Sequence, residues 1–184
     1  MTFIFDDVLT DAERIFVQNN ILSENPPTFP WFYIGSTVDY HDPEHDHEYF
    51  IHTLVHRIEN SSDESIESRI NSRFFSFFNK IFFRVCEKAD IYPKKIFRAA
   101  VNLTLHQPVD HGGIHLDHFF EHKNFLLYLN DFTGGSTYVY NENHEVIEEI
   151  QAKKNRAVIF DGKYHAASFC APKEKRVVAV FTFL

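Results

Sequence analysis

Residues 110–117 are Asp-His-Gly-Gly-Ile-His-Leu-Asp, and residues 161–165 are Asp-Gly-Lys-Tyr-His. Each stretch passes from a glycine-containing turn into a segment that we expect to be extended. In an extended segment, residues i and i+2 point to the same side, roughly 7 Å apart along the backbone. His115 and Asp117 can therefore converge on one metal ion, and His165 can complete the set of ligands.

Two histidines and one carboxylate on a single face of an octahedron are the ligands of non-haem Fe(II) oxygenases, and they leave three coordination positions open. A His-x-Asp tripeptide alone carries little weight, because the chain contains 12 histidines. The turns before His115 and His165 strengthen the assignment. They predict that each ligand segment stands at the start of a strand.

The second half of the chain has the composition of a β domain. Runs rich in β-branched and aromatic residues alternate with turn residues, a pattern typical of a succession of short strands. The predicted strands comprise residues 125–130, 134–140, 157–160, 166–170 and 176–183. The predicted fold class is mainly β with supporting helices.

Arg176 opens the last predicted strand and shares a face with Val178, Val180 and Thr182. This alternation aims a guanidinium into an apolar interior. A buried cation without a partner is very unfavourable, and a planar guanidinium matches a carboxylate through two hydrogen bonds. An internal Asp or Glu, or water at the mouth of the strand, could satisfy Arg176, but a bound anion fits the neighbouring metal ligands better.

The pattern resembles the small 2-oxoglutarate- and Fe(II)-dependent dioxygenases of the prolyl 4-hydroxylase-like superfamily. The matching pieces are His115-x-Asp117, Tyr128-Leu129-Asn130, Gly134-Gly135-Ser136-Thr137, residues 155–161, His165, and Arg176 leading into Phe181-Thr182-Phe183. The resemblance is strong over residues 96–184 and is one of layout before them. It implies a double-stranded β-helix, or jelly roll, with N-terminal helices packed on the larger sheet.

The resemblance also implies the cofactor chemistry and the site residues. His115, Asp117 and His165 would bind Fe(II), and Arg176 with Tyr128 would hold the distal carboxylate of 2-oxoglutarate, with O2 as the other co-substrate. The implied reaction is hydroxylation of a C–H bond, and the favoured substrate is a prolyl-type side chain of a protein or peptide. Many relatives have Ser where this chain has Val178, and many prolyl hydroxylases have an acidic residue where it has Ser136.

Composition limits the other possibilities. The 184 residues, 44% of them hydrophobic, are enough for one domain without disulfides. We divide this domain into a support region, 1–95, and a catalytic core, 96–184.

The net charge of −8 argues against nucleic-acid binding. Cys86 and Cys170 are too few for a disulfide framework, and no secretory leader or membrane span is evident, so we expect a cytoplasmic protein. The oligomeric state is not predicted.

The first half contains two predicted helices and two predicted strands. Thr10 and Glu13 form a capping box for a helix over 11–20. Residues 31–34 and 49–55 have strand composition. Residues 61–64 are predicted to open a second helix, because apolar residues recur after them at spacings of three and four; they are Ile66, Ile70, Phe74, Phe77 and Ile81.

Further interpretations compete with or extend this one. His118, Glu121 and His122 fit the H-x-x-E-H pattern of inverted zinc hydrolases, which requires the two histidines on one helix. A cupin-type module could bind a metal without catalysis, although it would not need Arg176. The acidic and histidine-rich loop 39–48 is a candidate lid, and with Trp31 and Tyr33 it could form one wall of a peptide groove. Asn102 and Thr104 are weaker candidates for lining the pocket.

Overall fold

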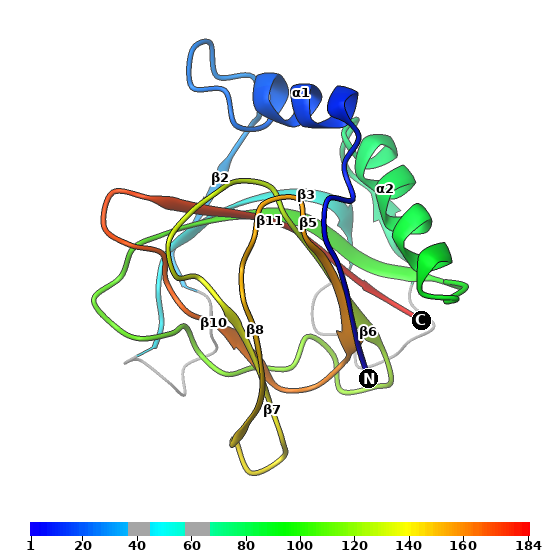
Figure 1. Cartoon of the computed structure of the whole chain (residues 1–184), viewed down its shortest axis with the longest axis vertical. Coiled ribbons are helices and arrows are strands. Elements are labelled where there is room, and N and C mark those ends of the chain that lie inside the picture. The colour runs from blue at the N-terminus through cyan, green and yellow to red at the C-terminus, as the bar shows by residue number, and fades with distance from the viewer. Residues whose placement is uncertain (37–44, 58–66) are drawn as a thin grey trace.

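The computed structural model describes residues 1–36, 45–57 and 67–184, and it consists of two β-sheets and two helices (Figure 1). The larger sheet has eight strands in the order β1-β9-β6-β11-β5-β3-β2, with β4 paired to β3, and the smaller has the order β10-β7-β8. The helices are α1 (Asp11–Asn20) and α2 (Phe75–Lys88). The strands are β1 (Thr2–Phe5), β2 (Phe32–Ile34), β3 (Tyr49–His56), β4 (Arg69–Ile70), β5 (Ile96–Leu105), β6 (Lys123–Tyr128), β7 (Thr137–Tyr140), β8 (Val146–Ile150), β9 (Ala157–Asp161), β10 (His165–Ala167) and β11 (Lys175–Phe183).

The prediction of a mainly β fold with few helices is confirmed, and the helix predicted over 11–20 coincides with α1. The second helix was predicted to begin too early. Arg69 and Ile70 form β4, which pairs with the end of β3, and α2 begins only at Phe75. Ile70 has the spacing of a helix stripe but is 68% exposed, so the periodicity came from a strand residue next to a helix. The predicted cap at residues 61–64 lies outside the described residues.

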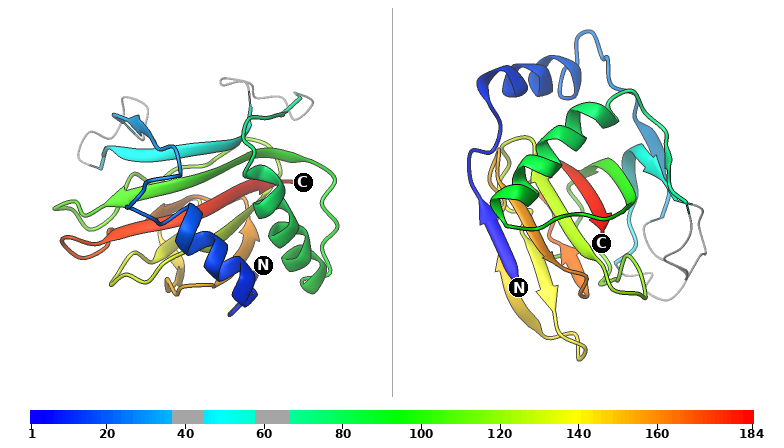
Figure 2. Two further views of the ribbon diagram at one scale, coloured as in Figure 1. Left: turned by 90° about the horizontal axis from the view of Figure 1, so that it is seen from above. Right: turned by 90° about the vertical axis from the view of Figure 1, so that its right-hand side faces the viewer.

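The last strand shows how the sheet separates two cores. Alternate residues of β11, from Val177 to Phe183, join a cluster that also contains α2 residues such as Phe78 and Phe82. Val178 lies on the opposite face and packs with Val139 and other residues of the smaller sheet. Figure 2 shows α2 lying across one face of the larger sheet. The inner face, between the sheets, carries this second apolar cluster and the polar residues discussed below.

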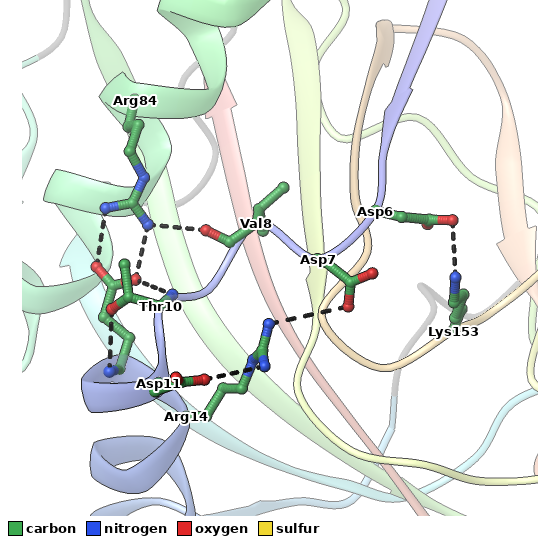
Figure 3. A network of polar contacts seen from close by, with 9 residues as sticks. Asp6, Asp7, Val8, Thr10, Asp11, Arg14, Arg84 and Lys153 are labelled. Carbon is green, nitrogen blue, oxygen red and sulfur yellow. Dashed lines mark hydrogen bonds and ion pairs between the residues drawn. The ribbon is translucent and has the colours of Figure 1, made fainter.

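Aromatic rings and a polar network hold the helices in place. Phe82 of α2 stacks on Phe181, with ring centroids 4.8 Å apart. At the start of α1, the Thr10 hydroxyl accepts a hydrogen bond from the Glu13 amide at 3.3 Å, and the Glu13 carboxylate accepts one from the Thr10 amide at 2.8 Å, which completes the capping box. The same carboxylate accepts two hydrogen bonds from Arg84 of α2. Arg84 also donates to the carbonyl of Val8 at 2.9 Å (Figure 3). The capping box therefore also joins the two helices.

Besides β4, two further short strands, β1 and β8, were not predicted. Thr2–Phe5 pairs with β9, far along the chain, and Val146–Ile150 pairs with β7.

Among the described residues, no helix has both the length and the apolar character needed to span a membrane.

Candidate metal centre

His115, Asp117 and His165 come together in the structure, with one potential ligand atom of each lying within 4.8 Å of the others. A pair of backbone hydrogen bonds brings them there. The amide of His115 donates to the carbonyl of His165 at 3.0 Å, and the amide of His165 donates back to His115 at 3.0 Å. His165 opens β10, as predicted, but His115 forms an isolated bridge instead of opening a strand. The bridge with His165 replaces the strand that was expected.

The two imidazoles are oriented by backbone carbonyls. Nδ1 of His115 lies 3.0 Å from the carbonyl of Gly113, and Nδ1 of His165 lies 2.9 Å from the carbonyl of Lys163. A carbonyl oxygen can only accept, so each Nδ1 carries the proton and each Nε2 keeps its lone pair. Nε2 of His165 lies 3.4 Å from Oδ2 of Asp117. Metal-binding histidines are commonly fixed by such outer hydrogen bonds.

The protonation states also suit a metal ion. Burial raises the pKa of Asp117, but the imidazoles of His165 and His115 and the guanidinium of Arg98 outweigh it and hold the pKa at about 2. Burial, together with His115, lowers the pKa of His165 to about 4. At neutral pH the carboxylate is therefore ionised and the His165 ring is neutral. These are the forms that coordinate a metal, so the three residues fit a divalent ion.

Arg176 is the second element of the site. It is buried on the inner face of β11, where Nε donates to the carbonyl of Gly135 at 3.1 Å and Nη2 donates to the hydroxyl of Thr137 at 3.2 Å. Its guanidinium carbon lies 5.5 Å from the centre of the Tyr128 ring, and the Tyr128 hydroxyl lies 2.9 Å from that of Thr137. Arg176 forms no ion pair with a carboxylate of residues 1–36, 45–57 or 67–184.

The missing counter-charge has a physical consequence. Burial lowers the pKa of Arg176 below its ordinary value. A guanidinium stays protonated in proteins, so the cost of burying its charge must be met by an anion or by oriented dipoles. One carbonyl and one hydroxyl are weak compensation. The arrangement of Arg176, Thr137 and Tyr128 fits a carboxylate that enters from solution.

Asn102 and Thr104 are strand neighbours of this cluster. In the register of β5 against β11, Thr104 faces Arg176 and Asn102 faces Val178, so both polar side chains lie on the inner face. Oδ1 of Asn102 is buried and has no hydrogen-bond partner in the part of the chain that the structure describes. A buried acceptor without a partner favours contact with a bound molecule or water.

The zinc-hydrolase interpretation is not supported by the structure. Residues 118–122 form no helix, so His118 and His122 do not present the pair of ligands that this class needs. His118 instead contacts Thr182 at 2.7 Å and Arg57, while Glu121 is exposed. Burial lowers the pKa of His118 to about 4. Among the described residues, the only cluster with suitable metal-binding geometry is the one at His115, Asp117 and His165.

The described part of the predicted lid lies near both ligand segments. The His45 ring stacks on the His111 ring with centroids 4.8 Å apart, and the His47 ring meets the Phe169 ring edge-on at 4.7 Å. Residues 45–48 thus contact the turn before His115 and the strand region after His165. Residues 39–44 of the predicted lid lie outside the described residues.

The two aromatic residues proposed for a groove wall differ in exposure. Trp31 is partly buried and packs against the helix-side core, 4.8 Å from Phe29. Tyr33 is 59% exposed and donates a hydrogen bond to Glu48 at 2.6 Å. Cys86 and Cys170 are free and buried, as predicted.

Comparison with known proteins adds an independent observation. Residues 101–183 match the family model of the 2OG-Fe(II) oxygenase superfamily. This range contains all three candidate metal ligands, Tyr128 and Arg176. No curated protein matches the sequence.

Solved structures share the fold at low sequence identity. A 2OG-Fe(II) oxygenase family oxidoreductase from Burkholderia pseudomallei is 14% identical, with a TM-score of 0.69 over 99% of this chain and 84% of its own. A prolyl hydroxylase from Trichoplax adhaerens, solved with a hypoxia inducible factor peptide, is 12% identical, with a TM-score of 0.66 over 100% of this chain and 83% of its own. A prolyl-4-hydroxylase from Pseudomonas putida is 12% identical, with a TM-score of 0.57 over 99% and 91%.

Proposed function

We propose that this chain is a 2OG-Fe(II) oxygenase, of the enzyme family that uses Fe(II), 2-oxoglutarate and O2, and that it hydroxylates a side chain of a protein or peptide, with proline as the first candidate. The match of residues 101–183 to the model of that family supports the first part of this proposal. The observation that carries the assignment of sites is the pairing of a three-ligand cluster with a buried, uncompensated Arg176. A structural metal site is closed by four protein ligands and has no use for a buried guanidinium nearby. This argues against the cupin-type module.

We assign His115, Asp117 and His165 as the Fe(II) ligands. When bound, the metal with 2-oxoglutarate and O2 supplies the oxidising chemistry, in which the co-substrate becomes succinate and carbon dioxide and a substrate C–H bond becomes C–OH. The chain's own contribution at this end is orientation. The carbonyls of Gly113 and Lys163 fix the two rings, so the metal-facing nitrogens do not rotate away.

Arg176 and Tyr128 are the proposed clamp for the distal carboxylate of 2-oxoglutarate. Thr137 links them by accepting from Arg176 and sharing a hydrogen bond with Tyr128, so the clamp is organised before the ligand arrives. Preorganised donors reduce the ordering cost of binding. The apolar side chains around the clamp, including Val178 and Val158, keep water from the charged group.

The two sheets, with an apolar cluster between them, support a double-stranded β-helix for residues 96–184. We further propose that residues 1–95 support this core. The helix-side cluster favours this division, since residues of α1 and α2 pack there with β11. Residues 1–184 would then form one domain.

A small-molecule substrate is the second candidate. One solved structure with the same fold, at 11% identity and a TM-score of 0.60, is an alpha ketoglutarate dependent epimerase from nogalamycin biosynthesis. The fold therefore serves reactions other than peptide hydroxylation. The same oxygenase chemistry on a small molecule uses the same metal ligands and the same clamp.

The two candidates can be separated by one screen. The purified protein is incubated with Fe(II), 2-oxoglutarate and O2, and succinate release is measured with peptide pools and with small-molecule pools. The peptide proposal predicts substrate-dependent succinate and a peptide that gains the mass of one oxygen atom. Modification of a free amino acid, nucleoside or lipid alone would contradict the peptide proposal and leave the oxygenase assignment intact. Asp117→Ala serves as the inactive control.

A further inference from the structure

A cluster of buried polar side chains lies next to Asp117, and the proposed chemistry does not use it. Its members are His118 at 7% exposure, His122 at 3%, Thr182 at 4% and Asn124 at 2%. Thr182 and Asn124 are register partners on β11 and β6, so their side chains lie on the same inner face. Four largely buried polar residues cost desolvation that apolar residues would avoid. Stability alone therefore does not explain them.

His118 connects the segment after Asp117 to the sheet. Arg57 contacts Nδ1 of His118, and because a guanidinium can only donate, this nitrogen is the acceptor. The other nitrogen, Nε2, therefore carries the proton and donates to the Thr182 hydroxyl at 2.7 Å. The Phe120 ring stacks on the His118 ring at 4.9 Å and fixes its plane. The residue directly after a metal ligand is thus held by two hydrogen bonds and a stacked ring.

His122 connects the same segment to the turn before His165. Its carbonyl accepts a hydrogen bond from the Gly162 amide at 2.8 Å. Its ring lies directly against Gly162, where an added Cβ would come within 2.4 Å of Cε1 and 2.5 Å of both ring nitrogens. Only glycine leaves room for this close approach. His122 thereby ties the Asp117 segment to the segment that carries His165.

We propose that His118 and His122 are positioning residues that brace Asp117, His118 through Thr182 on β11 and His122 through Gly162 on the other ligand segment. The inference rests on the proposed role of Asp117 as a metal ligand. Neither histidine needs to touch the ion. Their effect is to hold two segments of irregular backbone at the separation that a single ion requires.

The contacts of His118 and His122 should affect how tightly the protein binds a metal ion. Residues 115–122 contain no regular strand or helix, so strand hydrogen bonds do not fix the position of Asp117. Removing an outer contact to a metal ligand commonly weakens metal binding by about 10- to 100-fold. We expect an effect of that size from loss of the His118–Thr182 hydrogen bond.

A matched pair of substitutions tests the His118 arm. Thr182→Val keeps the shape of the side chain and removes the hydroxyl, whereas Thr182→Ser keeps the hydroxyl. Co(II) is titrated into each metal-free protein, and its visible absorption spectrum reports the arrangement of ligands. We expect Thr182→Val to bind Co(II) about 10- to 100-fold more weakly with an altered spectrum. Thr182→Ser should stay close to the wild type in both measurements.

Gly162→Ala tests the contact between His122 and Gly162. It also tests the proposal in the case that Thr182→Val does not fold. The added methyl group must displace the His122 ring, so we expect weaker Co(II) binding here as well. Glu121→Gln is the control, since Glu121 lies between the two histidines in sequence but is exposed. It should leave Co(II) binding unchanged.

The outcomes separate the two proposals. If the wild-type protein binds no Co(II), or if Asp117→Ala binds it as well as the wild type, the metal-site assignment is wrong. If the wild type binds Co(II) through Asp117 but Thr182→Val and Gly162→Ala show wild-type affinity and spectrum, the brace is wrong. Lower melting temperatures of the metal-free variants with unchanged Co(II) affinity and spectrum would also overturn it, because they indicate a purely structural role.

Discussion

The metal cluster and the Arg176 clamp are built in opposite ways. The metal ligands include His115 and Asp117, which lie on irregular backbone, and their approach to His165 depends on one isolated backbone bridge. The clamp stands on regular strands, with Arg176 on β11, Tyr128 on β6 and Thr137 on β7. The metal cluster carries an ionised carboxylate with Arg98 3.7 Å away, whereas the cation of the clamp pairs with no carboxylate of the described residues. The difference indicates that the metal cluster depends on precise positioning and the clamp depends on charge.

The largest expected effect comes from removing a metal ligand. Asp117→Ala and His165→Ala should each abolish metal binding and turnover, because the described residues offer three ligands at this site and each of the two residues supplies one of them. Iron content after anaerobic loading is the measurement. Stoichiometric iron in His165→Ala would contradict the assignment, and unchanged melting of the metal-free protein would show that folding is intact.

Loss of the clamp should leave the metal cluster undisturbed. Arg176→Ala should keep Fe(II) but weaken 2-oxoglutarate binding by about 2 to 5 kcal/mol, at least tenfold in affinity, since the carboxylate would lose a charge-assisted partner. Calorimetric titration of 2-oxoglutarate into the metal-loaded protein measures this. Arg176→Lys is the matched control. Its affinity for 2-oxoglutarate should lie between those of the wild type and Arg176→Ala, because lysine keeps the charge but lacks the planar geometry. Wild-type affinity in Arg176→Ala would place the clamp elsewhere.

Removal of the Tyr128 hydroxyl should weaken 2-oxoglutarate binding less than removal of Arg176 does. Tyr128→Phe removes the bond to Thr137, and a typical hydrogen bond contributes about 1 kcal/mol, so 2-oxoglutarate affinity should fall severalfold. Metal affinity should not change. The same calorimetric titration measures this effect. An equal loss of metal and 2-oxoglutarate affinity would show that the metal cluster and the clamp are not independent.

Much of this comparison could be predicted from the sequence, for local reasons. The i, i+2 spacing of His115 and Asp117 and the alternation that places Arg176 on the inner face are properties of short segments, and the capping box at Thr10 likewise lies within four residues. β1 could not be predicted in this way. It has only four residues, and its partner, β9, lies more than 150 positions away. Its strand character comes from that pairing.

The errors have a similar cause. The apolar spacing of Ile66, Ile70 and Phe74 suggested a helix, but Ile70 pairs with Val55 in a two-residue strand, and tertiary pairing overrode the periodicity. The roles of His118 and His122 were also hidden. Their spacing suggested a zinc motif, whereas their contacts with Thr182 and Gly162 depend on residues far along the chain.

The smallest expected effect concerns the segment that borders the site. His45→Ala removes the stacked contact with His111, and aromatic pairs of this kind contribute about 0.5 to 1.5 kcal/mol. If residues 45–48 help to cover the site, the KM for the substrate found in the screen should rise modestly, while Fe(II) and 2-oxoglutarate binding stay constant. A change in metal affinity instead would mean that the contact supports the His115 turn.

The most direct test of the central claim is a crystal structure of the protein with Fe(II) and 2-oxoglutarate, prepared without oxygen. The account predicts one iron, identified by its anomalous scattering, bound by His115, Asp117 and His165, with the distal carboxylate of 2-oxoglutarate on Arg176 and Tyr128. Iron held by other residues, or a distal carboxylate away from Arg176, would contradict it.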